Sequence, residues 1–128
     1  MSISPQPPIV LTKTKEAYKL WFKSLADFPK VYRYSLGGKI ENCFLSLLEN
    51  TFITAYLSGE KKASQLSLAI LKLDNLKFFL QLAWENRCLS NNHYATLSES
   101  LNEIGRMLGG WKKGLETKTS PNYRGRNQ

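Results

Sequence analysis

The sequence predicts an all-α protein, folded as an antiparallel four-helix bundle. Apolar residues recur at intervals of three and four along four long segments, which is the period of one face of an α-helix. No segment shows the period of two that marks a half-buried β-strand. Because the connections between the segments are short, consecutive helices are expected to pack antiparallel.

The expected bundle occupies residues 10–115 of the 128-residue chain. This length suits a single domain, which can bury roughly two-thirds of the surface that its unfolded chain exposes. Residues 1–9 are rich in Pro and Ser and are expected to form a mobile N-terminal segment. Residues 116–128 contain Pro, Gly and basic residues without an apolar period, so they are expected to form a basic, mobile C-terminal tail.

The first two helices are expected over residues 10–26 and 36–57. Phe28-Pro29 ends the first, because a proline disfavours helix in the residue before it. Gly59 stands where a helix-ending glycine is expected after the second. The apolar stripes are Leu11, Tyr18, Trp21, Phe22 and Leu25 in the first helix, and Ile40, Phe44, Leu47, Leu48, Thr51 and Ala55 in the second.

Gly37-Gly38 lies near the start of the second helix, where glycine is unfavourable. One interpretation is the close approach of another backbone segment, and the other is a frayed or bent first turn. The sequence does not favour either.

The third helix, expected over residues 61–87, is apolar on more than one face. A helix that is apolar nearly all round is buried nearly all round. The excess of apolar surface on this helix favours a second interface and therefore a homo-oligomer. The alternative is a central helix wrapped by the other three. Its two stripes are Leu66, Ile70, Leu73, Leu80 and Trp84, and Leu68, Leu71, Phe78, Phe79 and Leu82.

The fourth helix is expected over residues 91–115, with Ser90 as its N-cap. Ser98, Gly105 and Gly109 are small residues on a face beside its apolar seam, where another helix can come close. The seam has the period of a coiled coil and consists of Tyr94, Leu97, Leu101, Ile104, Leu108, Trp111 and Leu115.

The residues that enzymes use for catalysis are sparse, so the chain is predicted not to be an enzyme and to need no cofactor. The one histidine, His93, is expected to be a surface or capping residue. Cys43 and Cys88 are expected to be small reduced core residues, and nothing supports a disulfide between them. There is no zinc-ligand spacing and no phosphate-binding loop.

The same sequence predicts a cytoplasmic protein with no membrane partner. No apolar run reaches the roughly 18 residues that a membrane span needs. The first eight residues do not show the basic-then-apolar pattern of a signal peptide.

Positive charge is the main functional signal. The formal net charge is +8, which favours a polyanion such as nucleic acid as partner, with added solubility as the alternative. Lysine and arginine neutralise phosphates without reading bases, so binding should be salt-dependent and weakly sequence-specific. The candidate contact residues are Lys13, Lys15, Lys19, Lys23, Lys30, Arg33, Lys39, Lys61, Lys62, Lys77, Arg87, Lys112 and Lys113.

Lys77 stands out because it interrupts the most apolar helix, in the run Leu76-Lys77-Phe78-Phe79. A fully buried, unpaired lysine would be unfavourable. Its ammonium group is therefore expected either to reach the surface along its aliphatic chain or to line a wet channel between subunits.

Three stretches of the sequence resemble a known family. The run Phe28–Ile40, FPKVYRYSLGGKI, resembles the first helix junction of small four-helix-bundle proteins, including those encoded by ribosomal intervening sequences. Residues 73–83 and the run Ile104–Trp111, IGRMLGGW, resemble the accessory variability determinant (Avd) proteins of diversity-generating retroelements. The resemblance covers about residues 11–115.

The resemblance implies a non-catalytic accessory subunit that forms a ring-like homo-oligomer, a pentamer. It implies binding to the retroelement's reverse transcriptase and to template RNA, with cDNA as a further ligand, in support of mutagenic cDNA synthesis. Lys77 matches a position that is basic in the family, while Gln81 is uncharged where a relative can carry a basic residue. The alternative is a basic oligomer of the intervening-sequence type without a polymerase partner.

Overall fold

The structure, a computed structural model, describes residues 9–119, with side chains described for residues 9–115. It confirms the all-α bundle, and the described residues contain no strand. The expectations for residues 1–8 and 120–128 fall outside the described part of the chain. The elements are α1 (Ile9–Ser24), a 3₁₀ turn (Leu25–Asp27), α2 (Lys30–Arg33), α3 (Leu36–Thr54), α4 (Gly59–Glu85) and α5 (Asn91–Thr119).

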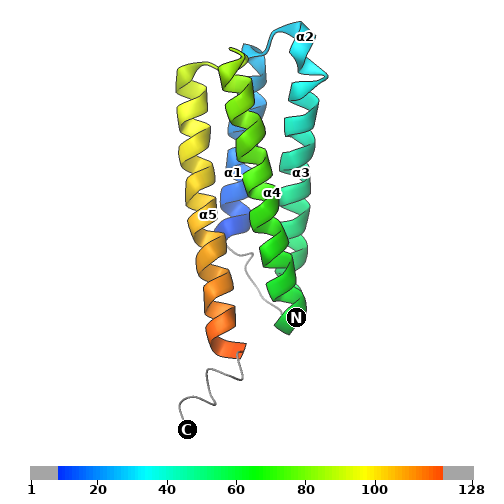
Figure 1. Cartoon of the computed structure of the whole chain (residues 1–128), viewed down its shortest axis with the longest axis vertical. Helices are drawn as coiled ribbons and strands as arrows, with labels where there is room; N and C mark the ends of the chain where they lie inside the picture. The colour runs from blue at the N-terminus through cyan, green and yellow to red at the C-terminus, as the bar shows by residue number, and fades with distance from the viewer. Residues whose placement is uncertain (1–8, 120–128) are drawn as a thin grey trace.

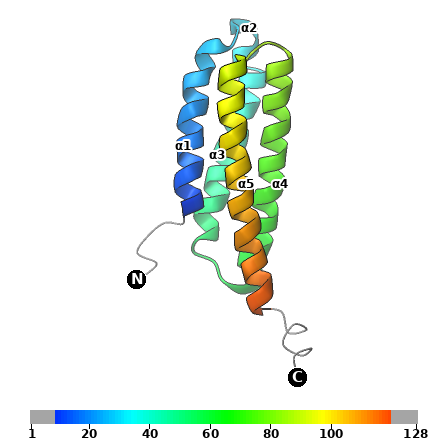
Figure 2. The same ribbon diagram turned by 90° about the vertical axis from the view of Figure 1, so that its left-hand side faces the viewer.

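The four long helices run alternately up and down (Figure 1). Helix α1 packs against α3 and α5, and α4 packs against the same two helices, so that α1 and α4 are diagonally opposite (Figure 2). The α2 corner and the α4–α5 connection share one end of the bundle, here named the upper end. The α3–α4 connection lies at the opposite, lower end. With 27 residues, α4 spans about 40 Å.

The core follows the apolar seams of the sequence. Trp21 and Phe44 are fully buried and stack with their ring centroids 6.0 Å apart. Helix α5 confirms its predicted seam, because Leu97, Leu101, Ile104 and Leu108 are fully buried while Tyr94, Trp111 and Leu115 pack at the margin of the core.

A polar cluster crosses from α1 to α3 beside this core. The Glu41 carboxylate accepts hydrogen bonds from the Tyr18 hydroxyl and, at 2.8 Å, from Trp21 Nε1. The bond to Glu41, followed by burial, raises the pKa of Tyr18. Glu41 therefore gives the buried indole N–H of Trp21 the partner that it requires.

The predicted apolar stripe of α1 was wrong at Phe22, which is 64% exposed. Thr14 and Ser24 are buried instead. Both hydroxyls donate to carbonyls of their own helix, Thr14 to Val10 and Ser24 to Leu20, each at 2.7 Å. These bonds satisfy the hydroxyls locally, so the buried face of α1 includes polar residues that an apolar pattern does not count.

At the upper end, the corner before α3 lies against Gly37, the first residue of the glycine pair. A Cβ on Gly37 would lie 3.4 Å from the Tyr32 carbonyl oxygen and 3.6 Å from the Phe28 ring. These are ordinary van der Waals distances, and a Cβ on Gly38 would meet nothing within 4 Å, so the close approach of another segment requires glycine at neither position.

The ends of the later helices differ from their predicted positions. Helix α3 ends at Thr54, and Gly59, with a φ of 61°, is the first residue of α4 and does not end α3. Helix α4 ends at Glu85, two residues before the predicted Arg87, and α5 continues past Leu115 to Thr119.

The connection between α4 and α5 is a well-defined cap. The amide of Cys88 donates to the Ala83 carbonyl at 2.8 Å, and that of Arg87 to the Trp84 carbonyl at 3.0 Å, which is the Schellman pattern. Arg87 takes the left-handed position with a φ of 61°. Ser90 is confirmed as the N-cap of α5, since its hydroxyl accepts the His93 amide at 3.0 Å.

Candidate nucleic-acid interface

The predicted contact residues do not form one continuous patch. Lys15, Lys19 and Lys23 are exposed along α1, Lys30, Arg33 and Arg87 lie at the upper end, and Lys61, Lys62, Lys112 and Lys113 lie at the lower end. Lys13, Lys39 and Lys77 stand in three different grooves between helices.

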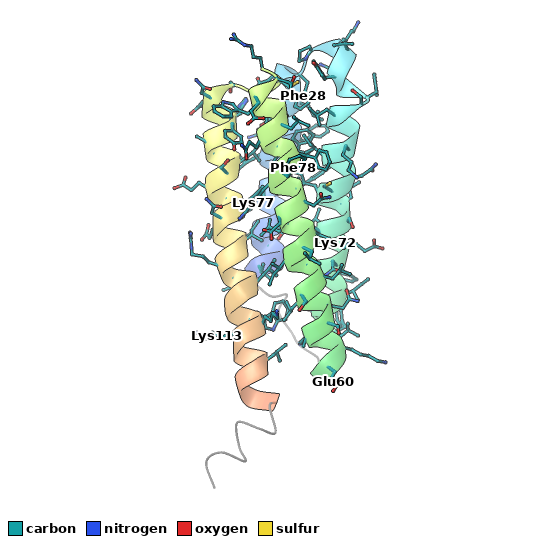
Figure 3. All side chains as sticks on the ribbon, in the orientation of Figure 1. Phe28, Glu60, Lys72, Lys77, Phe78 and Lys113 are labelled. Carbon is teal, nitrogen blue, oxygen red and sulfur yellow. The ribbon has the colours of Figure 1, made fainter. Side chains whose placement is uncertain are left out.

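The lower end brings together the start of α4 and the last turns of α5. The Lys62 ammonium lies 5.3 Å from the centre of the Trp111 ring, a cation–π contact that links the two helices. Lys61 is exposed in the first turn of α4, Lys113 is exposed on α5 (Figure 3), and Lys112 is half-buried. This end is basic, with Glu60 as the acidic residue in the first turn of α4.

The groove between α1 and α5 has mixed charge. Three glutamates, Glu16, Glu99 and Glu103, line it beside Lys13 and Arg106. The Lys13 ammonium lies 3.8 Å from a carboxylate oxygen of Glu103 and 3.9 Å from one of Glu16. Lys13 therefore links α1 to α5 through a partly exposed ion pair with Glu103.

At the upper end, Asp27 joins the first helix corner to the start of α5. Its carboxylate oxygen Oδ2 accepts the Ser90 amide at 3.1 Å and lies 2.6 Å from Nδ1 of His93. Burial alone would raise the pKa of Asp27, but the bonds with His93 and Ser90 outweigh it and lower that pKa. His93 is thus a half-exposed structural partner. Lys30 and Arg87 are exposed at this end, while Arg33 is half-buried and its Nη2 donates to the Phe28 carbonyl at 3.5 Å.

The groove between α4 and α5 contains Lys77. Its ammonium group lies over Gly105, where a Cβ would be 3.6 Å from Lys77 Nζ and 3.3 Å from the Leu73 side chain. Gly105 therefore leaves the space that the lysine side chain occupies on its way to the surface, as expected of a small residue there. Asp74 and Gln81 line the same groove, so its charge is mixed.

The groove between α3 and α4 is basic, and the sequence prediction included only one of its two lysines. Lys39 and Lys72 line it together with Asn42, Cys43, Ser46 and Asn75. Lys72 donates to the Ser46 hydroxyl, and the Lys39 ammonium lies 5.3 Å from the centre of the Phe79 ring. In Figure 3, Lys72 is on the α3 side of α4 and Lys77 is on the α5 side. Lys72 was not among the contact residues predicted from the sequence.

Cys43 closes the inner side of this groove as a free, buried thiol, and Cys88 is also free and buried, as predicted. Burial raises the pKa of the Cys43 thiol, although the charges of Lys39 and Lys72 oppose that rise. The thiol is therefore protonated at neutral pH and is a packing residue.

The outer face of α4 is an unpartnered apolar strip. Leu68, Leu71 and Phe78 are 41%, 66% and 58% exposed, at spacings of three and seven residues along one side of the helix. The opposite side holds the buried residues of α4, including Leu73, Leu76 and Leu80. The other helices do not wrap α4, so the wrapped central helix is ruled out for this chain.

Within residues 9–119, no group of three or more His, Cys, Asp or Glu side chains is placed to hold a metal ion. None of the described helices combines the length and apolarity needed to cross a membrane.

Comparison with known proteins identifies the family of this chain. No curated protein and no solved structure matches the chain. A protein-family model described as bAvd-like matches residues 9–115, which run from the start of α1 through most of α5. The match confirms the resemblance to Avd proteins drawn from residues 73–83 and 104–111. Because it covers most of the chain, the protein belongs to the bAvd-like family.

Proposed function

We propose that this chain is a non-catalytic accessory subunit of a diversity-generating retroelement. In this role it binds the retroelement's reverse transcriptase and template RNA in the cytoplasm, with cDNA as a further ligand, and supports mutagenic cDNA synthesis. The observation that carries the proposal is the bAvd-like match over residues 9–115. The net charge of +8 supports a polyanionic partner.

RNA contact is proposed for the basic groups that gather at the two ends of the bundle. These groups neutralise phosphates, so affinity should fall steeply with salt and depend little on base sequence. Lys13 is left out, because Glu16 and Glu103 already surround its ammonium group. The proposed contacts at the two ends of the bundle are Lys30, Arg33 and Arg87, and Lys61, Lys62, Lys112 and Lys113.

Self-association is proposed through the apolar strip Leu68, Leu71 and Phe78. Burying a large apolar side chain contributes about 1.5–3 kcal/mol, so this strip favours a second copy of the chain over water. A ring of five subunits is the form that the family resemblance suggests. The basic groups at both ends of each bundle would then repeat around the ring.

The proposal is tested by copurification with the reverse transcriptase encoded near this gene, with and without its template RNA, across a salt series. We expect the enzyme and the RNA to be retained at low salt and the RNA to be released as salt rises. Absence of any association at low salt would contradict the proposal and favour a basic oligomer of the intervening-sequence type.

A further inference from the structure

The groove between α3 and α4 differs from the other grooves described above in its charge. Its six lining residues, Lys39, Asn42, Cys43, Ser46, Lys72 and Asn75, include two lysines and no acid. The α1/α5 groove has three glutamates, and the α4/α5 groove is lined by Asp74 as well as Lys77. The upper-end hollow, lined by Arg87, contains Asp27 and Glu85.

The lining groups of the groove are mainly hydrogen-bond donors. Two ammonium groups and two side-chain amides face it, and an ammonium group has no acceptor capacity. The Ser46 hydroxyl accepts from Lys72, which leaves its own proton free for an outside acceptor. Such a set of donors matches the oxygens of a phosphate.

The helix framework holds these donors in place. Lys39, Asn42 and Ser46 recur at three- and four-residue spacing on one face of α3, and Lys72 and Asn75 do so on α4. The Phe79 ring holds the Lys39 side chain, and Ser46 holds that of Lys72. The ammonium groups are thus less free than those of ordinary surface lysines.

The size of the groove limits what can enter. Its volume is about 250 Å³, below the roughly 300–1,000 Å³ of pockets that enclose whole small molecules. Lys39 precedes Ser46, the partner of Lys72, by two helical turns, a rise of about 10 Å. The charges therefore lie at two levels along an open channel, an arrangement that suits the repeated phosphates of a strand.

From this arrangement we infer that the α3/α4 groove is a backbone-phosphate site for single-stranded nucleic acid, with Lys39 and Lys72 as its charged contacts. The inference rests on the proposed function and adds a place for the strand on the bundle. Asn42, Asn75 and Ser46 supply neutral hydrogen bonds to phosphate oxygens. Because its charged contacts go to the phosphate backbone, the site should depend little on base sequence.

The test measures the affinity of the full chain for a short fluorescent oligouridylate across a potassium chloride series. Each phosphate contact on a single strand contributes about −0.7 to the slope of log affinity against log salt. The double variant Lys39→Gln/Lys72→Gln should therefore reduce the magnitude of the slope by about 1.4. The control Lys13→Gln/Arg106→Gln removes the same charge from the glutamate-rich groove and should leave the slope near that of the wild type.

A second variant guards against loss of folding. Asn75 is exposed, so Asn75→Asp places a negative charge in the groove with minimal change in shape. It should weaken oligouridylate binding, while Asn92→Asp, at an exposed position in the first turn of α5, should not. Far-ultraviolet circular dichroism checks that every variant keeps its helical signal.

A wild-type slope in the Lys39/Lys72 variant together with wild-type affinity in Asn75→Asp would overturn the inference and leave the proposed function standing. A wild-type chain that binds no oligouridylate even at low salt would overturn both. Calorimetry with inorganic phosphate distinguishes the phosphates of a nucleic-acid strand from free phosphate as the ligand of the groove. Tight phosphate binding that the groove variants abolish, with oligouridylate binding unchanged, would assign the site to free phosphate and contradict the nucleic-acid assignment.

Discussion

The Glu41 carboxylate shows how one polar residue can fix the contact between two helices. It accepts from Tyr18 and Trp21 of α1 while standing on α3. Trp21 is fully buried, and its indole N–H loses its partner if Glu41 is removed. Leaving a buried donor without a partner costs more free energy than an average hydrogen bond contributes to stability.

Replacing Glu41 with Ala should therefore lower the free energy of unfolding by about 1–3 kcal/mol. The control is Glu49→Ala, at an exposed position of the same helix, which should change it by less than about 0.5 kcal/mol. Urea denaturation followed by circular dichroism measures both. Equal effects of the two substitutions would show that the Glu41 bonds add nothing to stability.

Asp27 gives the fold a dependence on acid pH. Its pKa is lower in the folded chain than the ordinary value of 3.8, so the unfolded chain binds its proton more readily. The stability from the Asp27–His93–Ser90 contacts is present above the ordinary value and is lost as pH falls through the lowered pKa. Urea denaturation from pH 6 downward should show a steeper loss for the wild type than for Asp27→Asn. Parallel curves for the two would contradict this role, and Asp74→Asn, at an exposed position, serves as the charge control.

At the scale of the helices, the end of α4 has an unusual cap. Arg87 occupies the left-handed position that glycine usually takes in a Schellman motif. A side chain in that conformation is disfavoured, because its Cβ crowds the backbone.

Arg87→Gly should therefore raise the free energy of unfolding by about 0.5–1 kcal/mol. Asn86→Gly is the matched comparison, because Asn86 has a φ of −93° and its side chain donates to the Leu82 carbonyl at 2.9 Å. That substitution should destabilise the protein. Thermal denaturation of both variants measures these changes in stability. A loss of stability in Arg87→Gly would mean that the arginine side chain has a structural role.

The helices show which structural features the sequence could predict. The long seam of α5 was predictable, because strict spacing of three and four leaves one choice of buried face. The buried face of α1 was not predictable, because it includes Thr14 and Ser24, whose hydroxyls are satisfied by hydrogen bonds to carbonyls of their own helix. Gly59 was assigned to the end of α3, since glycine at positive φ is common at helix ends, and here that conformation opens α4.

At the scale of the whole molecule, the apolar strip on α4 adjoins the Lys77 groove, because Phe78 belongs to the strip and also lines that groove. The strip occupies the outer face of α4, and the Lys39/Lys72 groove and the Lys77 groove flank this helix on its two sides. A second copy of the chain on the strip therefore leaves the lower and upper ends exposed to a polyanion.

Substituting Leu71 and Phe78 together by Gln should dissociate the proposed oligomer into 14.6 kDa monomers. Phe22→Gln on α1, at a similarly exposed phenylalanine, should leave the assembly unchanged. Light scattering at micromolar concentration measures the mass. A wild-type chain that is already monomeric would refute self-association through this strip.

Much of the candidate site depended on tertiary structure that the sequence could not supply. The basic residues could be counted from the sequence, but their grouping depends on which helices are neighbours. The sequence alone did not distinguish Lys13 from Lys39 as a candidate contact, because it does not show that α5 places Glu103 beside Lys13. Lys72 was overlooked because its partner Ser46 lies on another helix.

The central claim, a non-catalytic subunit that a reverse transcriptase requires, is tested most directly by cDNA synthesis. The neighbouring reverse transcriptase is assayed on its template RNA alone, with this chain, and with the Lys39→Gln/Lys72→Gln variant. We predict cDNA only when the chain is present, none from the chain without the enzyme, and a reduced yield with the variant at higher salt. Equal cDNA synthesis with and without the chain would contradict the proposed accessory role.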